Sequence, residues 1–124
     1  RLGYKADALS GYLGTLEKSA PRYAIMAGNE VAGAAGIRLN WLRGPYVQFL
    51  GILPDYQKRR LGSTFLAWLA HEAKRHGEQN VWVLASVFNA DALRFYEMNG
   101  FARTGEIVDL VAPGTAEVLL RRRL

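Results

Sequence analysis

Cysteine and long apolar runs are both absent from this 124-residue sequence. Without cysteine the chain has no disulfides, no thiolate metal ligands and no cysteine nucleophile. No apolar run approaches the roughly 18 residues of a membrane-spanning helix, and the first residues lack the basic-then-apolar pattern of a signal peptide. We therefore expect a cytoplasmic protein with no membrane partner and no metal site. Because Arg1 stands where a start methionine would be, we also expect a trimmed or processed chain.

Negative charge is in the minority, with 11 acidic residues against 16 Lys and Arg, a net charge of +5. Six of the cations lie in two clusters, residues 58–60 and 121–123. Nucleic-acid binding is one interpretation of such clusters. No aromatic residue interleaves with the second cluster, as single-strand binding would require. We therefore favour a phosphate ligand at the first cluster and a solvated tail at the second, and treat nucleic acid as an unlikely partner.

The composition and the periodicity predict a single α/β domain over residues 1–124. Half of the residues are hydrophobic and 22% are charged, which is typical of a folded domain with its own core. Apolar spacing and turn residues predict the elements in order: a helix at 6–18, strands at 23–27, 31–41 and 46–53, a helix from 61 to about 76, a strand at 81–87, a helix at 90–98, and strands at 101–111 and 115–121. This order predicts a mixed sheet rather than an all-parallel one.

The turn between residues 53 and 61 is the strongest candidate site. The preceding strand, residues 46–53, is almost continuously apolar, so we expect it to be central and buried on both faces. The turn carries the cation cluster, and the small residues Gly62 and Ser63 open the next helix. A helix N-terminus leaves N–H groups unpaired and carries positive partial charge. The turn is therefore expected to hold an anion, most simply a phosphate or pyrophosphate.

A second candidate follows the strand at 81–87. If the two strand–helix units are adjacent and parallel, both helix N-termini point to one edge of the sheet, and Asn89 and Tyr96 come near the cationic turn. Asn89 is either an N-cap or a polar contact to an extended ligand. Tyr96 is either a half-buried aromatic or a proton donor, since a tyrosine of pKa near ~10 is protonated at neutral pH.

Two motifs in these segments carry a family resemblance. The first runs from Gln57 to Gly62 after an apolar strand and Pro54, and fits the pattern Gln/Arg-x-x-Gly-x-Gly/Ala except at one position. The second is Asn89, Ala92, Tyr96 and then Asn99-Gly100-Phe101. Residues 23–120 resemble the GNAT superfamily of acyl-CoA N-acyltransferases. The fold so implied has a mixed sheet with a splayed centre and helices on both faces.

The resemblance also implies roles for particular residues. Acetyl-CoA would be the co-substrate, and the strand residues Ile52 and Leu53 would lie beside it, with the Ile52 backbone pairing with the pantetheine arm. Asn89 would contact pantetheine and Tyr96 would protonate the departing thiolate. The CoA pyrophosphate would be held by the backbone of the turn, namely Gln57, Lys58, Arg59, Arg60, Leu61, Gly62 and Ser63.

The sequence departs from the family pattern at three points. Arg60 occupies the position of the first motif glycine, where its side chain would either crowd the phosphates or swing outward and add a charge. The strand at 46–53 offers Gln48 but no carboxylate as a general base. The family's N-terminal strand and helix are apparently missing. Either the chain is trimmed, or that edge of the sheet is open, or a second subunit completes it in a homodimer.

The predicted function is acetyl transfer from acetyl-CoA to a primary amine on a small molecule or peptide. Direct attack is expected, because no cysteine or activated serine offers a covalent route. The alternative is a CoA-binding domain of the same fold that has no catalytic activity and serves as a sensor or assembly module. A basic nucleic-acid-binding domain is the third and least favoured interpretation.

Overall fold

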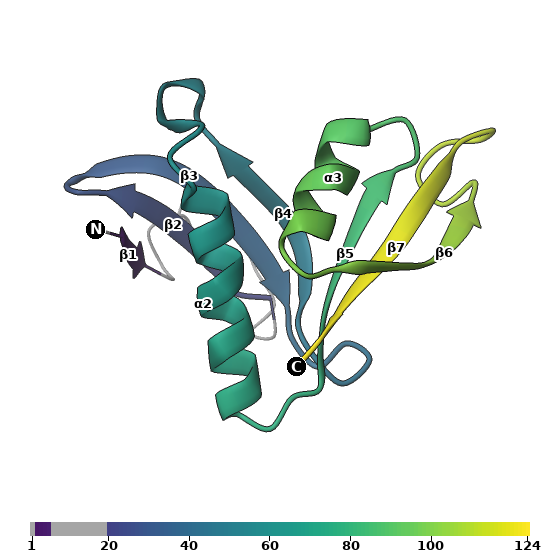
Figure 1. Ribbon diagram of the computed structural model, residues 1–124, viewed down its shortest axis with the longest axis horizontal. Helices are drawn as coiled ribbons and strands as arrows, with labels where there is room; N and C mark the ends of the chain where they lie inside the picture. The colour runs from purple at the N-terminus through teal and green to yellow at the C-terminus, as the bar shows by residue number, and fades with distance from the viewer. Residues whose placement is uncertain (1, 6–19) are drawn as a thin grey trace.

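The computed structural model describes residues 2–5 and 20–124, which form one seven-stranded mixed sheet with two α-helices (Figure 1). The strand order is β1-β2-β3-β4-β5-β7-β6. The helix predicted for residues 6–18 lies outside the described residues. The elements are β1 (Leu2–Lys5), β2 (Arg22–Ala27), β3 (Glu30–Arg38), β4 (Tyr46–Ile52), the 3-10 turn η1 (Pro54–Tyr56), α2 (Leu61–Arg75), β5 (Asn80–Ser86), α3 (Ala90–Met98), β6 (Ala102–Val108) and β7 (Ala116–Arg123).

The prediction that the N-terminal strand is missing was wrong. β1 runs antiparallel to β2, with Leu2 opposite Ala27 and Lys5 opposite Ala24. Four residues are too few to display the alternation by which a strand is recognised in a sequence. Because β1 lies along β2, the open edge at β2 that had suggested a homodimer is occupied.

Helix α2 forms where the sequence predicts it. Phe65, Leu66 and Leu69 are buried on one side of it and face the sheet, as helical spacing requires. Lys74 and Arg75 occupy the last turn, where cations complement the helix dipole. Gly77 follows with φ +83°, a left-handed conformation that glycine adopts without steric cost.

Strand β4 is central, as predicted, but the prediction that it is buried on both faces was wrong. It pairs with β5 in parallel only at Tyr46–Trp82 and Val47–Val83. Beyond Val47 the two strands diverge, and Figure 1 shows them opening as a V. Phe49 is therefore 39% exposed. An apolar strand that lacks a neighbour on one side exposes residues that a continuous sheet would cover.

Both described helices lie over the same face of the sheet (Figure 1). Helix α2 connects β4 to the parallel β5, and α3 leads from β5 to β6, which lies farther in the same direction across the sheet. Right-handed crossovers in one direction place their helices on one face. Phe65 of α2 and Leu93 of α3 accordingly share a core with Val83 of β5 and Leu120 of β7.

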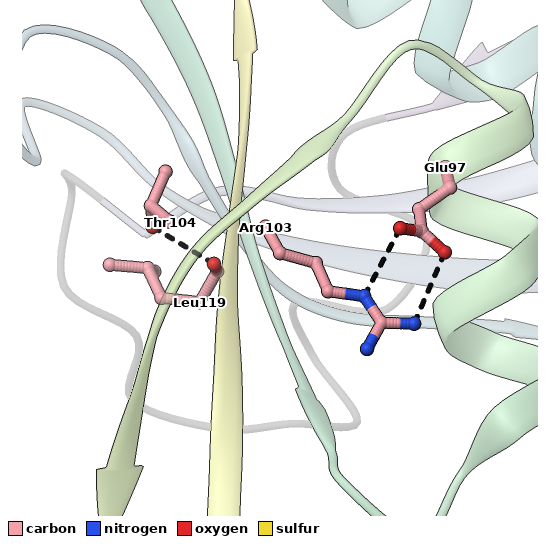
Figure 2. A network of polar contacts seen from close by, with 4 residues as sticks. All are labelled: Glu97, Arg103, Thr104 and Leu119. Atoms are coloured by element: carbon pink, nitrogen blue, oxygen red, sulfur yellow. Dashed lines mark hydrogen bonds and ion pairs between the residues drawn. The ribbon is translucent and has the colours of Figure 1, made fainter.

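Helix α3 is held against the start of β6 by polar contacts (Figure 2). The Arg103 guanidinium donates to the Glu97 carboxylate through Nε at 3.1 Å and Nη2 at 3.3 Å. The β6–β7 register shifts between Arg103 and Gly105, and the Thr104 hydroxyl at this bulge donates to the Leu119 carbonyl at 2.9 Å. These contacts fix the end of α3 beside the sheet. No helix in the described part of the chain is both long and apolar enough to span a membrane.

Candidate active site

The splay between β4 and β5 opens into a cavity of about 540 Å³. It brings together the two candidate segments, which lie about thirty residues apart in the sequence. The cavity is lined by β4, by the turn and first residues of α2, and by α3, namely Leu50, Ile52, Tyr56, Gln57, Lys58, Arg60, Leu61, Gly62, Ser63, Asp91, Ala92, Phe95 and Tyr96. We call this cavity the cleft. Six of the predicted turn residues and Tyr96 line it.

The backbone of β4 presents a hydrogen-bonding edge to the splay. The Leu53 N–H donates to the Ala32 carbonyl of β3 at 2.7 Å. Since alternate residues of a strand direct their backbone groups to opposite edges, Leu50 and Ile52 direct theirs away from β3, toward the gap. The Gln57 side chain confirms this direction, because its Nε2 donates to the Ile52 carbonyl from that side at 3.1 Å. An extended ligand chain in the gap can therefore pair with β4 as an added strand.

The turn keeps the shape of an anion cradle although Arg60 replaces the motif glycine. Arg60 is the N-cap of α2 at φ 60° and ψ 24°, and its side chain makes no capping hydrogen bond. Lys58 also has a positive φ, 65°. The Thr64 N–H and hydroxyl both donate to the Arg60 carbonyl, at 2.9 Å and 2.8 Å. Arg60 thus adopts the left-handed backbone that a glycine would adopt, and the first N–H groups of α2 remain available to a ligand.

Gly62 allows the two helices that border the cleft to approach each other. A Cβ atom at this position would lie 3.0 Å from Cζ of Phe95 on α3. The neighbouring Leu61 is buried, whereas Ser63 is half-buried at the cleft wall. The small residues after the turn therefore serve both the packing of α2 on α3 and access to the helix N-terminus.

Arg59 and Leu53 do not line the cleft. The Arg59 guanidinium lies over the Tyr56 ring, 5.1 Å from its centre. Leu53 is 51% exposed and borders a separate pocket of about 330 Å³ at the ends of β3 and β4. Cofactor contacts by these two side chains stay predictions.

Tyr56 is a cleft residue that the sequence reasoning missed. Its hydroxyl donates to the carboxylate of Glu30, the first residue of β3, and this hydrogen bond raises the pKa of Tyr56. The contact joins the cationic turn to the first hairpin, 26 residues away in sequence. No local sequence signal could have identified this contact, because Glu30 simply begins β3 after an ordinary hairpin turn.

The N-cap interpretation of Asn89 is confirmed. Its Oδ1 accepts from the Ala92 N–H at 3.0 Å at the start of α3. The side chain is exposed and is not part of the cleft lining. The alternative role of Asn89, a contact to pantetheine, stays a prediction.

Tyr96 lies in the cleft wall between two aromatic rings. Its ring centre is 5.3 Å from that of Phe95 and 5.6 Å from that of Phe101, both edge-on. Burial raises the pKa of Tyr96 above its ordinary value, and the proximity of Tyr46 raises it further. The hydroxyl is therefore protonated at neutral pH and can donate a proton into the cleft.

Glu117 is a carboxylate on the face opposite the helices that the sequence reasoning also missed. It lies on β7 next to Val118, whose side chain is buried in the core beneath the helices, so alternation directs Glu117 to the other face. Burial raises the pKa of Tyr46, and the charge of Glu117 raises it further. The Glu117 carboxylate thus acts on Tyr46 from this face, while its backbone pairs with Ser86 at the end of β5. Among residues 2–5 and 20–124 no group of three or more acidic or histidine side chains is placed to bind a metal ion.

Known structures with this fold include enzymes with CoA ligands. A putative streptothricin acetyltransferase from Bacillus anthracis, solved with acetyl coenzyme A, has a TM-score of 0.78 at 17% identity, over 87% of this chain and 64% of that one. An acetyltransferase from Bacillus subtilis, solved with CoA, has a TM-score of 0.76 at 15% identity, over 100% of this chain and 99% of that one. At these identities the likeness shows the fold.

Sequence comparison identifies the family. An aminoalkylphosphonate N-acetyltransferase from Salmonella typhimurium is 31% identical over 65 residues, which are 52% of this chain and 41% of that protein. The matched part of this chain thus spans less than half of that relative. Residues 4–101 match the Acetyltransferase (GNAT) family, a match that extends over most of the chain and includes both motifs. This chain therefore belongs to the GNAT family of acetyltransferases.

Proposed function

We propose that this protein transfers an acetyl group from acetyl-CoA to a primary amine by direct attack. The observation that carries the proposal is the convergence of the cationic turn, the open edge of β4 and Tyr96 on one cleft of about 540 Å³. The turn supplies positive charge and helix N–H groups for the pyrophosphate. The β4 edge supplies backbone groups for the pantetheine amides, and Tyr96 supplies a proton near the thioester.

The reaction proceeds in two steps. The amine nitrogen attacks the thioester carbon, and a backbone N–H of β4 stabilises the resulting oxyanion. The C–S bond then breaks, and the thiolate takes the proton of the Tyr96 hydroxyl, which is later replaced from solvent. The attacking amine loses its own proton to Glu117, whose carboxylate lies on the face opposite the helices and acts on Tyr46 at the start of β4.

An amine acceptor also agrees with the relatives. By their names, one relative acetylates aminoalkylphosphonates, and two enzymes of similar fold acetylate spermidine and the alanine of a ribosomal protein. These acceptors share only an amine. The predicted cytoplasmic location suits such acceptors and stays part of the proposal.

Acetyl-CoA is expected to stabilise the protein against heat. A ligand at 100 times its Kd adds about 2.7 kcal/mol to the free energy of unfolding, which corresponds to a rise in Tm on the order of 10 °C for a domain of this size. A thermal melt with and without acetyl-CoA, followed by a screen of amines for release of free CoA thiol, tests the proposal. Stabilisation without transfer to any amine would support the non-catalytic CoA-binding alternative. No shift at millimolar acetyl-CoA would refute both.

Arg60→Gly is expected to change stability and cofactor affinity in opposite directions. A left-handed backbone at a non-glycine residue lowers the free energy of unfolding by about 1–2 kcal/mol, and glycine removes this strain. The greater freedom of glycine in the unfolded chain offsets about half of the gain. The melting temperature of the free protein should therefore rise slightly. Loss of a cation that lines the cleft should weaken acetyl-CoA binding about 10-fold. The matched control is Arg43→Gly, which removes another arginine of positive φ, 65°, outside the cleft. Equal acetyl-CoA affinities of the two variants, measured by calorimetry, would show that Arg60 does not contact the cofactor.

A further inference from the structure

Arg22 lies on the face of the sheet opposite the helices with part of its guanidinium unsatisfied. Its Nε and Nη1 atoms are buried, and no group in the described part of the chain accepts a hydrogen bond from either. Arg103 shows the usual arrangement in the same protein, since its Nε and Nη2 both donate to Glu97. A buried charged donor without an acceptor is costly to keep. Within residues 2–5 and 20–124, Arg22 therefore has donors left over for a partner such as a bound ligand.

The position of Arg22 is built by its neighbours. Its guanidinium carbon lies 5.5 Å from the centre of the Phe49 ring. Gly36, which is opposite both Arg22 on β2 and Phe49 on β4, makes room for them. A Cβ at Gly36 would lie 2.5 Å from the Phe49 ring and 2.6 Å from Nη1 of Arg22. Stacking on a ring uses the face of the guanidinium and leaves the N–H groups at its edge to find acceptors in the plane.

This arginine lies where an acceptor can approach the thioester. On the helix side of β4 the cleft is taken up by the cofactor in the proposed complex, so the amine arrives through the splay from the opposite face. Phe49 is only two residues beyond Val47, where β4 and β5 part. Further along β4, Gly51 has open space on its side-chain face and, with Ala34, borders the pocket of about 330 Å³. Small residues thus leave open surface beside Phe49, further along β4.

We propose that Arg22 recognises the acceptor, and that the acceptor is a small primary amine bearing a carboxylate or phosphonate on a short aliphatic chain. The anionic group accepts hydrogen bonds from the guanidinium, the chain lies along Phe49 and Gly51, and the amine reaches the gap between β4 and β5. This inference rests on the proposed acetyl transfer and names its substrate class. It makes Arg22 a specificity-determining residue, distinct from the residues that bind CoA.

The test compares amines that differ only in the anionic group. Initial rates of thiol release are measured at saturating acetyl-CoA with β-alanine, 2-aminoethylphosphonate, propylamine, ethanolamine and spermidine. A charged hydrogen bond contributes about 1.5–3 kcal/mol, so kcat/KM for the better anionic amine should exceed that for propylamine by about 10- to 150-fold. The ratio between β-alanine and 2-aminoethylphosphonate identifies which anion the site prefers. A preference for propylamine or spermidine would overturn the inference and leave acetyl transfer established.

Arg22→Met keeps the apolar stem over Phe49 and removes the charge. This variant should lower kcat/KM for the preferred anionic amine by about the same 10- to 150-fold, mainly because KM rises. For propylamine, kcat/KM should change less than threefold. Arg22→Lys should give an intermediate value, because it keeps the charge but not the planar donors. Arg43→Met is the matched control on a surface loop and should change neither rate. Equal losses for anionic and neutral amines in Arg22→Met would overturn the inference.

Thermal stability separates recognition from a structural role. Without amine, Arg22→Met should melt at or above the temperature of the wild type, because it removes a buried donor that has no acceptor. With CoA present, 2-aminoethylphosphonate or β-alanine should raise the melting temperature of the wild type and not that of Arg22→Met. A marked fall in the melting temperature of the free variant would mean that Arg22 serves the fold, against the inference. If acetyl-CoA did not raise the melting temperature of the wild type, the proposed function itself would be refuted.

Discussion

Tyr96→Phe is expected to lower kcat at least tenfold while leaving the affinity for CoA nearly unchanged. The substitution removes only the hydroxyl, and the ring keeps its contacts with Phe95 and Phe101. A thiolate that departs without a proton donor leaves more slowly, since general acid catalysis typically contributes about 10²- to 10⁴-fold. Steady-state rates give kcat, and calorimetry with CoA gives the affinity.

The control for this substitution is Tyr23→Phe. Tyr23 is also half-buried among aromatic rings, with Trp68 at 5.4 Å, and burial raises its pKa as well, but it lies outside the cleft. Loss of the hydroxyl in Tyr23→Phe should leave kcat within about twofold of the wild-type value. Equal turnover of Tyr96→Phe and wild type would remove Tyr96 from the mechanism.

The raised pKa of Tyr96 also sets the direction of the pH dependence. Burial favours the neutral phenol, so the proton donor is lost only above the ordinary tyrosine pKa of about 10. The rate of the chemical step should therefore show no decline from this group between pH 7 and about pH 10. Stability should depend on pH in the same direction. The buried neutral phenol of Tyr96 makes its full contribution to the free energy of unfolding below about pH 10, and this contribution is lost as the pH rises through the folded-state pKa.

Gly44→Ala is expected to destabilise the fold by about 3 kcal/mol or more. A Cβ at this buried position would lie 1.7 Å from the Asn80 carbonyl oxygen and 2.6 Å from its carbon, both backbone atoms that no rotamer change can move. Forced overpacking of this kind costs about 1–3 kcal/mol and sometimes more. For a domain of this size the melting temperature should fall by about 10 °C or more, as measured by calorimetry or circular dichroism.

The loss is expected to be large because the loop around Gly44 is docked on the start of β5. The Arg43 carbonyl accepts from the N–H groups of Gln79 and Asn80, at 2.9 Å and 3.1 Å. The Leu42 carbonyl accepts from the side chains of Asn80 and Trp82. Displacing the loop would break this set of hydrogen bonds at the only place where β4 and β5 pair.

Gly105→Ala is the control for Gly44→Ala. A Cβ at Gly105 would meet nothing within 4 Å, so the stability should change by less than about 0.5 kcal/mol. If Gly44→Ala melted within a degree or two of Gly105→Ala, the close approach of the loop to β5 would be wrong.

The kinds and order of most elements, and the cationic turn, were predictable from the sequence because their signals are local. Leu61, Phe65 and Leu69 recur at helical spacing, and Gly77 marks the end of α2. The Asn89 cap and the helix it begins follow the same local logic. The motif residues from Gln57 to Gly62 and Tyr96 were likewise recognisable from residue type and spacing alone.

Local signals did not predict which surfaces the strands would leave open. The apolar run of β4 predicted burial on both faces, whereas the strand loses its β5 neighbour after Val47 and becomes the wall of a cleft. The divergence of two strands depends on pairing partners more than thirty residues apart in the chain. The sequence of one strand therefore does not indicate where its neighbour leaves it.

The sequence alone therefore determined the elements of this protein and its candidate residues: an α/β chain with a cationic turn before one helix and a tyrosine in another. Only the tertiary structure decided that these lie on one cleft, that Tyr56 ties the turn to Glu30, and that Arg22 stacks on Phe49 with donors unsatisfied. The physical reason is that propensity and periodicity act within a few residues, whereas strand register, strand divergence and the pairing of buried charges are settled between segments that are distant in the chain.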